Sequence, residues 1–80
     1  MADAQRPFVP VRIAVLTVSD SRTAADDRSG DTLVARLTAA GHVLAARALL
    51  PDERAEIVAR LRAWIADPAI DVVISTGGTG

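Results

Sequence analysis

Three groups of residues in this sequence have types and spacing suited to binding phosphate-bearing ligands. The first is the run Thr76-Gly77-Gly78-Thr79-Gly80, whose glycines let successive backbone N–H groups turn toward one anion. The second is Asp52, which follows a proline, and the third is the pair Ser19 and Asp20. The 80 residues contain no cysteine and no lysine, which excludes thiolate zinc sites, cysteine nucleophiles, Walker A loops and lysine Schiff bases from them.

Each of these groups also has a purely structural explanation. The glycine run can be a tight strand-to-helix turn, but its place after a buried strand favours ligand binding, most commonly of phosphate. Asp52 can be a helix N-cap, and the residue pattern alone favours that role over holding Mg²⁺ or a phosphate-bearing substrate. Ser19 and Asp20 can cap backbone groups in a loop or contact a polar ligand, and the pattern leaves both open.

Three short apolar runs predict strands that would position these residues. Residues 11–18 are rich in β-branched side chains, which indicates a strand buried on both faces of a parallel sheet. Residues 42–50 and 70–75 predict the second and third strands, although the alanines of the second also suit a helix. With the helices between them, this order predicts an α/β fold with right-handed crossovers. If the first strand is central, the loops after the first and third strands line one crevice.

Two amphipathic segments predict the connecting helices. The first begins with Ser29 as its N-cap and ends at Gly41, where a left-handed C-cap belongs. The second begins with Asp52 as its N-cap and ends at Asp67, because the residue before a proline avoids the helical conformation. Its apolar stripe includes Trp64, which we expect in the core.

Two further polar features are expected to have structural roles only. Residues 26–28 (DDR) are predicted to form a solvated loop, because their spacing matches no metal-ligand set. His42 follows the helix-ending glycine and is expected to interact with the terminal carbonyl groups of that helix.

The composition indicates one globular domain without a preference for nucleic acid or membranes. Half of the residues are apolar, 24% are charged, and the net charge is −1. No apolar run reaches the roughly 18 residues that span a bilayer, and the N-terminus lacks the apolar core of a secretory signal, so a cytoplasmic location is expected by default. Residues 1–10 are expected to be a flexible arm, and residues 11–80 the N-terminal part of a single domain.

Five motifs in order resemble the MoaB/MogA family of molybdenum cofactor biosynthesis. They span residues 11–80 and are TVSD at 17–20, DRSG at 27–30, GH at 41–42, PDE at 51–53 and STGGTG at 75–80. Each motif alone is weak, but their succession is specific. Residues 63–67 and the start of the first helix are closer to the MoaB branch.

The resemblance implies a three-layer α/β/α domain and, in the enzymes of the family, a molybdopterin adenylyltransferase. Such enzymes transfer AMP from ATP, with Mg²⁺, to the terminal phosphate of molybdopterin and release pyrophosphate. By resemblance, Thr76–Gly80 contribute to the molybdopterin and nucleotide site, Asp52 is important for catalysis and a candidate metal ligand, and Ser19 and Asp20 border the pocket. Members form trimers or hexamers.

Two properties of the family limit what this chain is expected to do. The family continues past the glycine loop with another aspartate and further elements, so residues 1–80 are expected to hold only part of the active site. Some MoaB-type members lack the aspartate that corresponds to Asp52 and do not catalyse the reaction. The alternative function is therefore a non-catalytic, oligomeric molybdopterin-binding protein, although the presence of Asp52 favours the enzyme.

Overall fold

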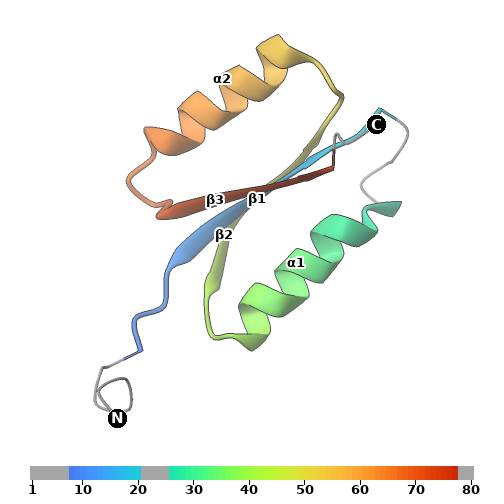
Figure 1. Ribbon diagram of the computed structural model, residues 1–80. Helices are drawn as coiled ribbons and strands as arrows, with labels where there is room; N and C mark the ends of the chain where they lie inside the picture. The colour runs from blue at the N-terminus through green and yellow to red at the C-terminus, as the bar shows by residue number, and fades with distance from the viewer. Residues whose placement is uncertain (1–7, 21–25, 78–80) are drawn as a thin grey trace.

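Strands and helices alternate along the chain in the predicted order (Figure 1). The computed structural model describes residues 8–20 and 26–77. Its elements are β1 (Arg12–Val18), α1 (Arg28–Ala39), β2 (Val43–Leu50), α2 (Arg54–Ile65) and β3 (Val72–Gly77). Each strand begins one or two residues later than predicted. No helix in these two ranges is long and apolar enough to cross a membrane.

The sheet is parallel, with strand order β2-β1-β3, so the first strand is central and the condition stated above for a single crevice is met. The two helices cover opposite faces of this sheet, which gives three layers, α/β/α (Figure 1). Val18, the last residue of β1, pairs with Leu50 on one side and with Gly77 on the other. The carboxyl ends of all three strands therefore lie at one edge of the sheet.

The core is built around β1, in which every side chain from Ile13 to Val18 is buried. Successive side chains of a strand point to opposite faces, so β1 contributes to two apolar clusters. The cluster under α2 comprises Ala14, Leu16, Val18, Ala46, Ala48, Leu50, Ile57, Leu61, Trp64, Ile70 and Val73. The cluster under α1 comprises Val11, Ile13, Val15, Leu33, Val34, Leu37 and Ile74. Trp64 thus lies in the core, as predicted.

Both helices begin differently from the prediction. Asp27, not Ser29, is the N-cap of α1, and its Oδ1 accepts a hydrogen bond from the Gly30 N–H at 3.0 Å. The predicted solvated loop at residues 26–28 is wrong for Asp27, which is 1% exposed. The N-cap of α2 is Glu53 and makes no side-chain cap hydrogen bond, so the prediction that Asp52 caps this helix is also wrong.

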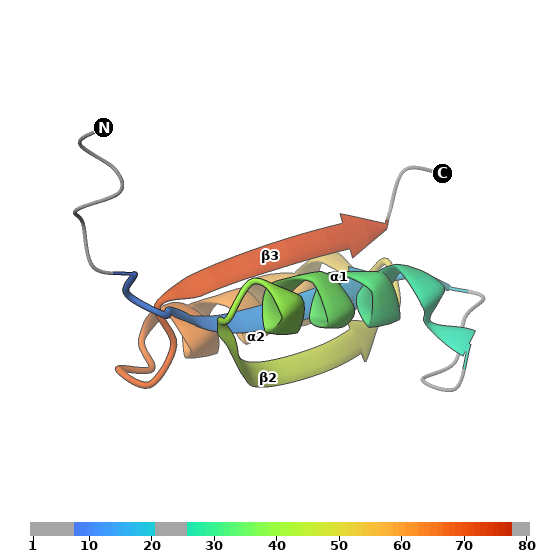
Figure 2. The same ribbon diagram turned by 90° about the horizontal axis from the view of Figure 1, so that it is seen from below.

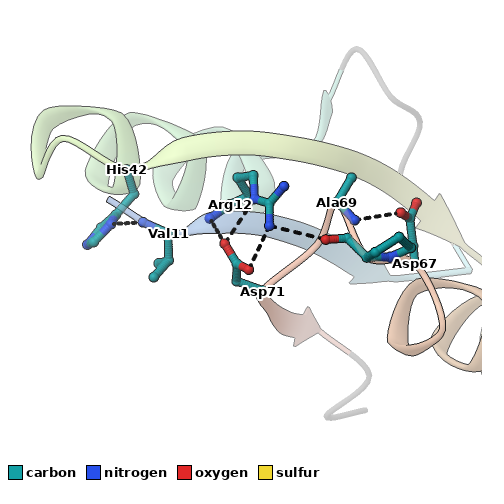
Figure 3. A network of polar contacts seen from close by, with 7 residues as sticks. Val11, Arg12, His42, Asp67, Ala69 and Asp71 are labelled. Carbon is teal, nitrogen blue, oxygen red and sulfur yellow. Dashed lines mark hydrogen bonds and ion pairs between the residues drawn. The ribbon is translucent and has the colours of Figure 1, made fainter. Parts of the chain in front are cut away.

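The turn between α1 and β2 has the predicted glycine cap and the predicted contact between His42 and a terminal carbonyl of α1. Gly41 has a φ of +90°, the left-handed conformation predicted for a C-cap. The backbone N–H of His42 donates to the Leu37 carbonyl at 2.9 Å, as such a cap requires. The contact with the helix is made by the backbone of His42, whereas its imidazole Nδ1 accepts a hydrogen bond from the Val11 N–H at 3.1 Å (Figure 3). The side chain therefore ties the start of β1 to β2.

A bidentate ion pair fixes the same end of β1 to the residue that precedes β3 (Figure 3). The Nε and Nη2 of Arg12 donate to the two carboxylate oxygens of Asp71, each at 3.0 Å, and the Arg12 backbone N–H donates to Asp71 Oδ2 at 2.8 Å. The hydrogen bonds from the Arg12 side chain, followed by the one from its backbone, lower the pKa of Asp71 to about 2.

The low pKa of Asp71 predicts a loss of stability in acid. Because the pKa is about 2 in the folded chain and near its ordinary value of 3.8 in the unfolded chain, the pair stabilises the fold above pH 4. This contribution is lost as the pH falls from about 4 to about 2. Urea unfolding of the whole protein between pH 2 and 5 should therefore show a shallower acid decline for Asp71→Asn than for the wild type. Identical profiles would contradict this assignment.

Candidate functional site

The structure brings the predicted site residues together at the carboxyl edge of the sheet. Ser19 and Asp20 follow β1, Asp52 follows β2, and Thr76 and Gly77 end β3. The arrowheads of β2 and β3 point the same way in Figure 2, as their parallel pairing with β1 requires. The three remaining predicted binding residues, Gly78, Thr79 and Gly80, lie outside the described residues.

Two hydrogen bonds join the loop after β1 to the loop after β2. The Ser19 N–H donates to the Leu50 carbonyl at 2.9 Å and so continues the parallel pairing beyond β1. Asp20 Oδ1 accepts a hydrogen bond from the Asp52 N–H at 2.9 Å. Asp20 therefore has the capping role that the residue pattern left open, and it holds the backbone of Asp52. Asp52 itself is exposed, so its carboxylate faces solvent at this edge.

Gly77 turns the chain at the end of β3 in a way that other residues could not. Its φ is +89°, and a Cβ at this position would collide with the backbone carbonyl oxygen of Val18. The absence of a side chain thus permits both the left-handed conformation and the close approach to β1. This is the conformational freedom that an anion-binding loop needs at its first residue.

A Gly77→Ala variant of the whole protein is expected to lose stability by about 1–3 kcal/mol, the cost of a side chain in this region of φ. The collision with Val18 would also displace the start of the glycine loop, so binding of a phosphate-bearing ligand there should weaken at the same time. Thermal unfolding and a direct binding titration would measure the two effects. Ser75→Ala, at an exposed position in the same strand, is the matched control and should change neither.

A buried polar network beside this edge was missed by the sequence prediction. Thr17 Oγ1 donates to Asp27 Oδ2 at 2.8 Å, and Arg47 Nη2 donates to the same oxygen at 3.1 Å. Arg47 Nη2 also donates to Asp31 Oδ1 at 2.6 Å. Thr17 is fully buried. Position 30 requires glycine, because a Cβ at Gly30 would collide with the Asp27 carboxylate.

The hydrogen bonds keep Asp27 ionised in spite of its burial. Burial alone would raise its pKa, but the Gly30 N–H, the Thr17 hydroxyl and the Arg47 guanidinium all favour the carboxylate, and the pKa is lowered. Two features of the sequence could have revealed the network: Thr17 is a hydroxyl in an apolar strand, and Arg47 is the one charged residue of β2. A buried hydroxyl needs a hydrogen-bond partner, and a single charge in an otherwise apolar strand suggests an ion pair.

The carboxylates at the edge suit a cation that also binds phosphate. In residues 8–20 and 26–77, no group of three or more histidine, cysteine, aspartate or glutamate residues could hold a metal ion. Mg²⁺ in phosphate-transfer sites, however, is commonly held by one or two carboxylates together with substrate phosphates and water. Asp52 fits this arrangement, since it is exposed at the carboxyl edge of the sheet, where its N–H bonds Asp20.

The sequence of this chain is similar to those of known proteins. A family described as "Probable molybdopterin binding domain" matches residues 14–80. Molybdenum cofactor biosynthesis protein B of Escherichia coli strain K12 is 42% identical over 80 residues, which are 100% of this chain and 47% of that protein. The protein of the same name from Bacillus subtilis is 40% identical over 70 residues, 88% of this chain and 41% of that protein.

The fold is also similar to a solved structure. A crystal structure of molybdenum cofactor biosynthesis protein B superimposes with a TM-score of 0.87 at 33% sequence identity. The match covers 94% of this chain and 47% of that one. The chain therefore spans about half the length of the relatives that it matches.

Proposed function

This chain belongs to the molybdopterin-binding domain family of molybdenum cofactor biosynthesis, and we propose that the whole protein transfers AMP from ATP to molybdopterin. In this reaction an oxygen of the terminal phosphate of molybdopterin attacks the α-phosphorus of ATP. The bond from that phosphorus to the β-phosphate oxygen breaks, and pyrophosphate leaves. Because the chain spans about half the length of its relatives, the activity is proposed for the whole protein.

One observation carries the proposal: Asp52 is held by Asp20 at the edge of the sheet where the glycine loop begins. Adenylyl transfer depends on positioning and on neutralising phosphate charge, and it needs no covalent nucleophile. Backbone N–H groups of the loop that starts at Thr76 and Gly77 are suited to bind a phosphate of molybdopterin or ATP. Ser19 borders the same edge.

Asp52 is the residue that we assign to the metal. Its exposed carboxylate would hold Mg²⁺, and the ion would supply positive charge to neutralise the reacting phosphates. The hydrogen bond from its N–H to Asp20 fixes its backbone, so that the carboxylate is presented from a defined position. Asp20 thus fixes the backbone of Asp52, and it also lies at the edge of the site itself.

The test is to incubate the whole protein with molybdopterin, Mg²⁺ and ATP labelled at the α-phosphate. We expect labelled adenylylated molybdopterin and an equal amount of pyrophosphate, and no product when EDTA removes the metal. Molybdopterin binding without product would identify a non-catalytic binding protein, the alternative function. Product formation in EDTA would overturn the role given to Asp52 and Mg²⁺.

We further propose that the whole protein is a homotrimer or homohexamer. The described residues leave large apolar side chains exposed, a type of surface that subunit contacts and further chain segments cover. These side chains are Phe8, Val9, Val43, Leu44, Ile65 and Val72. Sedimentation equilibrium of the whole protein measures the state, and a monomer would contradict the proposal.

A further inference from the structure

The carboxylate of Asp27 makes more contacts than a helix cap requires. An N-cap needs one oxygen, and Oδ1 fulfils this role by accepting from the Gly30 N–H at 3.0 Å. The second oxygen, Oδ2, accepts hydrogen bonds from two residues outside the helix: the Thr17 hydroxyl of β1 at 2.8 Å and Arg47 Nη2 of β2 at 3.1 Å. The need for a cap explains the first oxygen but not the burial and bonding of the second.

The residues that Oδ2 contacts, Thr17 and Arg47, lie in the strands that lead into the candidate site. Thr17 is two residues before Ser19, and Asp27 is ten residues after Thr17 along the chain. The Thr17–Asp27 bond therefore joins the two ends of the segment that leads from β1 to α1. Arg47 lies in β2, the strand whose last residue, Leu50, accepts the Ser19 N–H. One carboxylate thus connects β1, α1 and β2 where the loops of the site begin.

We propose that Asp27 is a positioning residue. By bonding Thr17, it holds the end of β1 to the start of α1 and so fixes Ser19 and Asp20 against the loop that carries Asp52. The functional half of this inference, that the positioning serves ligand binding, rests on the proposed molybdopterin site. The structural half, that Asp27 positions the loop, can be tested without a ligand. Fixing the start of the segment keeps Asp20 Oδ1 within hydrogen-bond distance of the Asp52 N–H. Asp27 thereby acts on the site through other residues and touches no substrate.

The test changes Thr17, because this leaves the cap of α1 in place. Thr17→Val has nearly the same shape but lacks the hydroxyl, whereas Thr17→Ser retains it. Val15→Ala is the matched control: Val15 is fully buried in the same strand and on the same face as Thr17, and its truncation breaks no hydrogen bond. All three variants are made in the whole protein.

Amide hydrogen exchange without ligand measures the positioning directly. The informative amides are those of Ser19 and Asp52, which donate across the two loops. In Thr17→Val, exchange at both should accelerate about tenfold, because the loss of a buried hydrogen bond costs on the order of 1.4 kcal/mol. Thr17→Ser should exchange as the wild type does. Equal acceleration in Val15→Ala, or none in Thr17→Val, would overturn the inference.

Binding of molybdopterin then tests whether the positioning serves the site. We expect the Kd of Thr17→Val to rise about five- to tenfold, and those of Thr17→Ser and Val15→Ala to stay within twofold of the wild type. An unchanged Kd in Thr17→Val together with faster exchange would overturn the functional half. If the wild type itself does not bind molybdopterin, the proposed function fails, and the exchange result alone still decides whether Asp27 positions the loop.

Discussion

An Asp52→Ala variant of the whole protein is expected to lose adenylyl transfer by about 100- to 1,000-fold, the usual effect of removing one electrostatic group from a reaction site. The side chain would no longer hold the metal that neutralises the phosphates. Molybdopterin binding should change little, because the backbone of the glycine loop is intact. Stability should also be retained, since Asp52 does not cap α2. Initial rates with labelled ATP and a thermal melt measure these outcomes.

Glu56→Ala is the matched control for this variant. Glu56 is an exposed carboxylate in the first turn of α2, so its removal changes the local charge by the same amount. The control should retain turnover to within a few-fold. Unchanged turnover in Asp52→Ala would remove Asp52 from the chemistry. A large loss of stability in that variant would instead restore the sequence-based interpretation of Asp52 as a structural cap.

The second large effect is expected for Asp27→Ala, which should destabilise the whole protein by about 2–4 kcal/mol. The loss of an N-cap costs about 0.5–2 kcal/mol, and a buried hydroxyl left without its partner costs about 1–3 kcal/mol more. The buried hydroxyl is that of Thr17. The remaining ion pair between Arg47 and Asp31 limits the loss. Urea unfolding at neutral pH, compared with the wild type, measures the free energy of unfolding.

Ser29→Ala separates the two interpretations of how α1 begins. Because Asp27 is the cap in the structure, Ser29→Ala should cost clearly less than Asp27→Ala. Asp27→Asn retains an oxygen for the Gly30 N–H but loses the negative charge opposite Arg47, so its loss should be intermediate. A larger effect of Ser29→Ala than of Asp27→Ala would contradict the structural assignment of the cap.

The sequence was sufficient to predict the five elements and their order. Continuous apolar runs and apolar residues at helical spacing depend on which side chains are buried, and this pattern is local. The apolar run of β1 indicated burial on both faces, and the structure shows β1 buried in the centre of the sheet. The strand ends shifted by one or two residues, because where pairing stops depends on the neighbouring strands.

The helix caps and the polar network were not predictable in the same way. Ser29 and Asp52 have suitable side chains, but the cap of α1 was decided by Thr17 and Arg47, which are 10 and 20 residues from Asp27. The bond from the Asp52 N–H to Asp20 spans 32 residues. Such contacts exist only once the sheet has formed. The edge on which Ser19, Asp20 and Asp52 meet was predictable from topology, but their hydrogen bonds were not.

The central place of β1 also determines how this chain can fold during synthesis. β1 leaves the ribosome before β2 and β3, yet its pairing with β3 has to wait for a strand that ends at Gly77. The bond between Arg12 and Asp71 closes a loop of 59 residues. Until then the apolar side chains of β1 have only part of their partners. Parallel pairings of such long range form slowly, so the apolar side chains of β1 stay exposed to aggregation until β3 has been made.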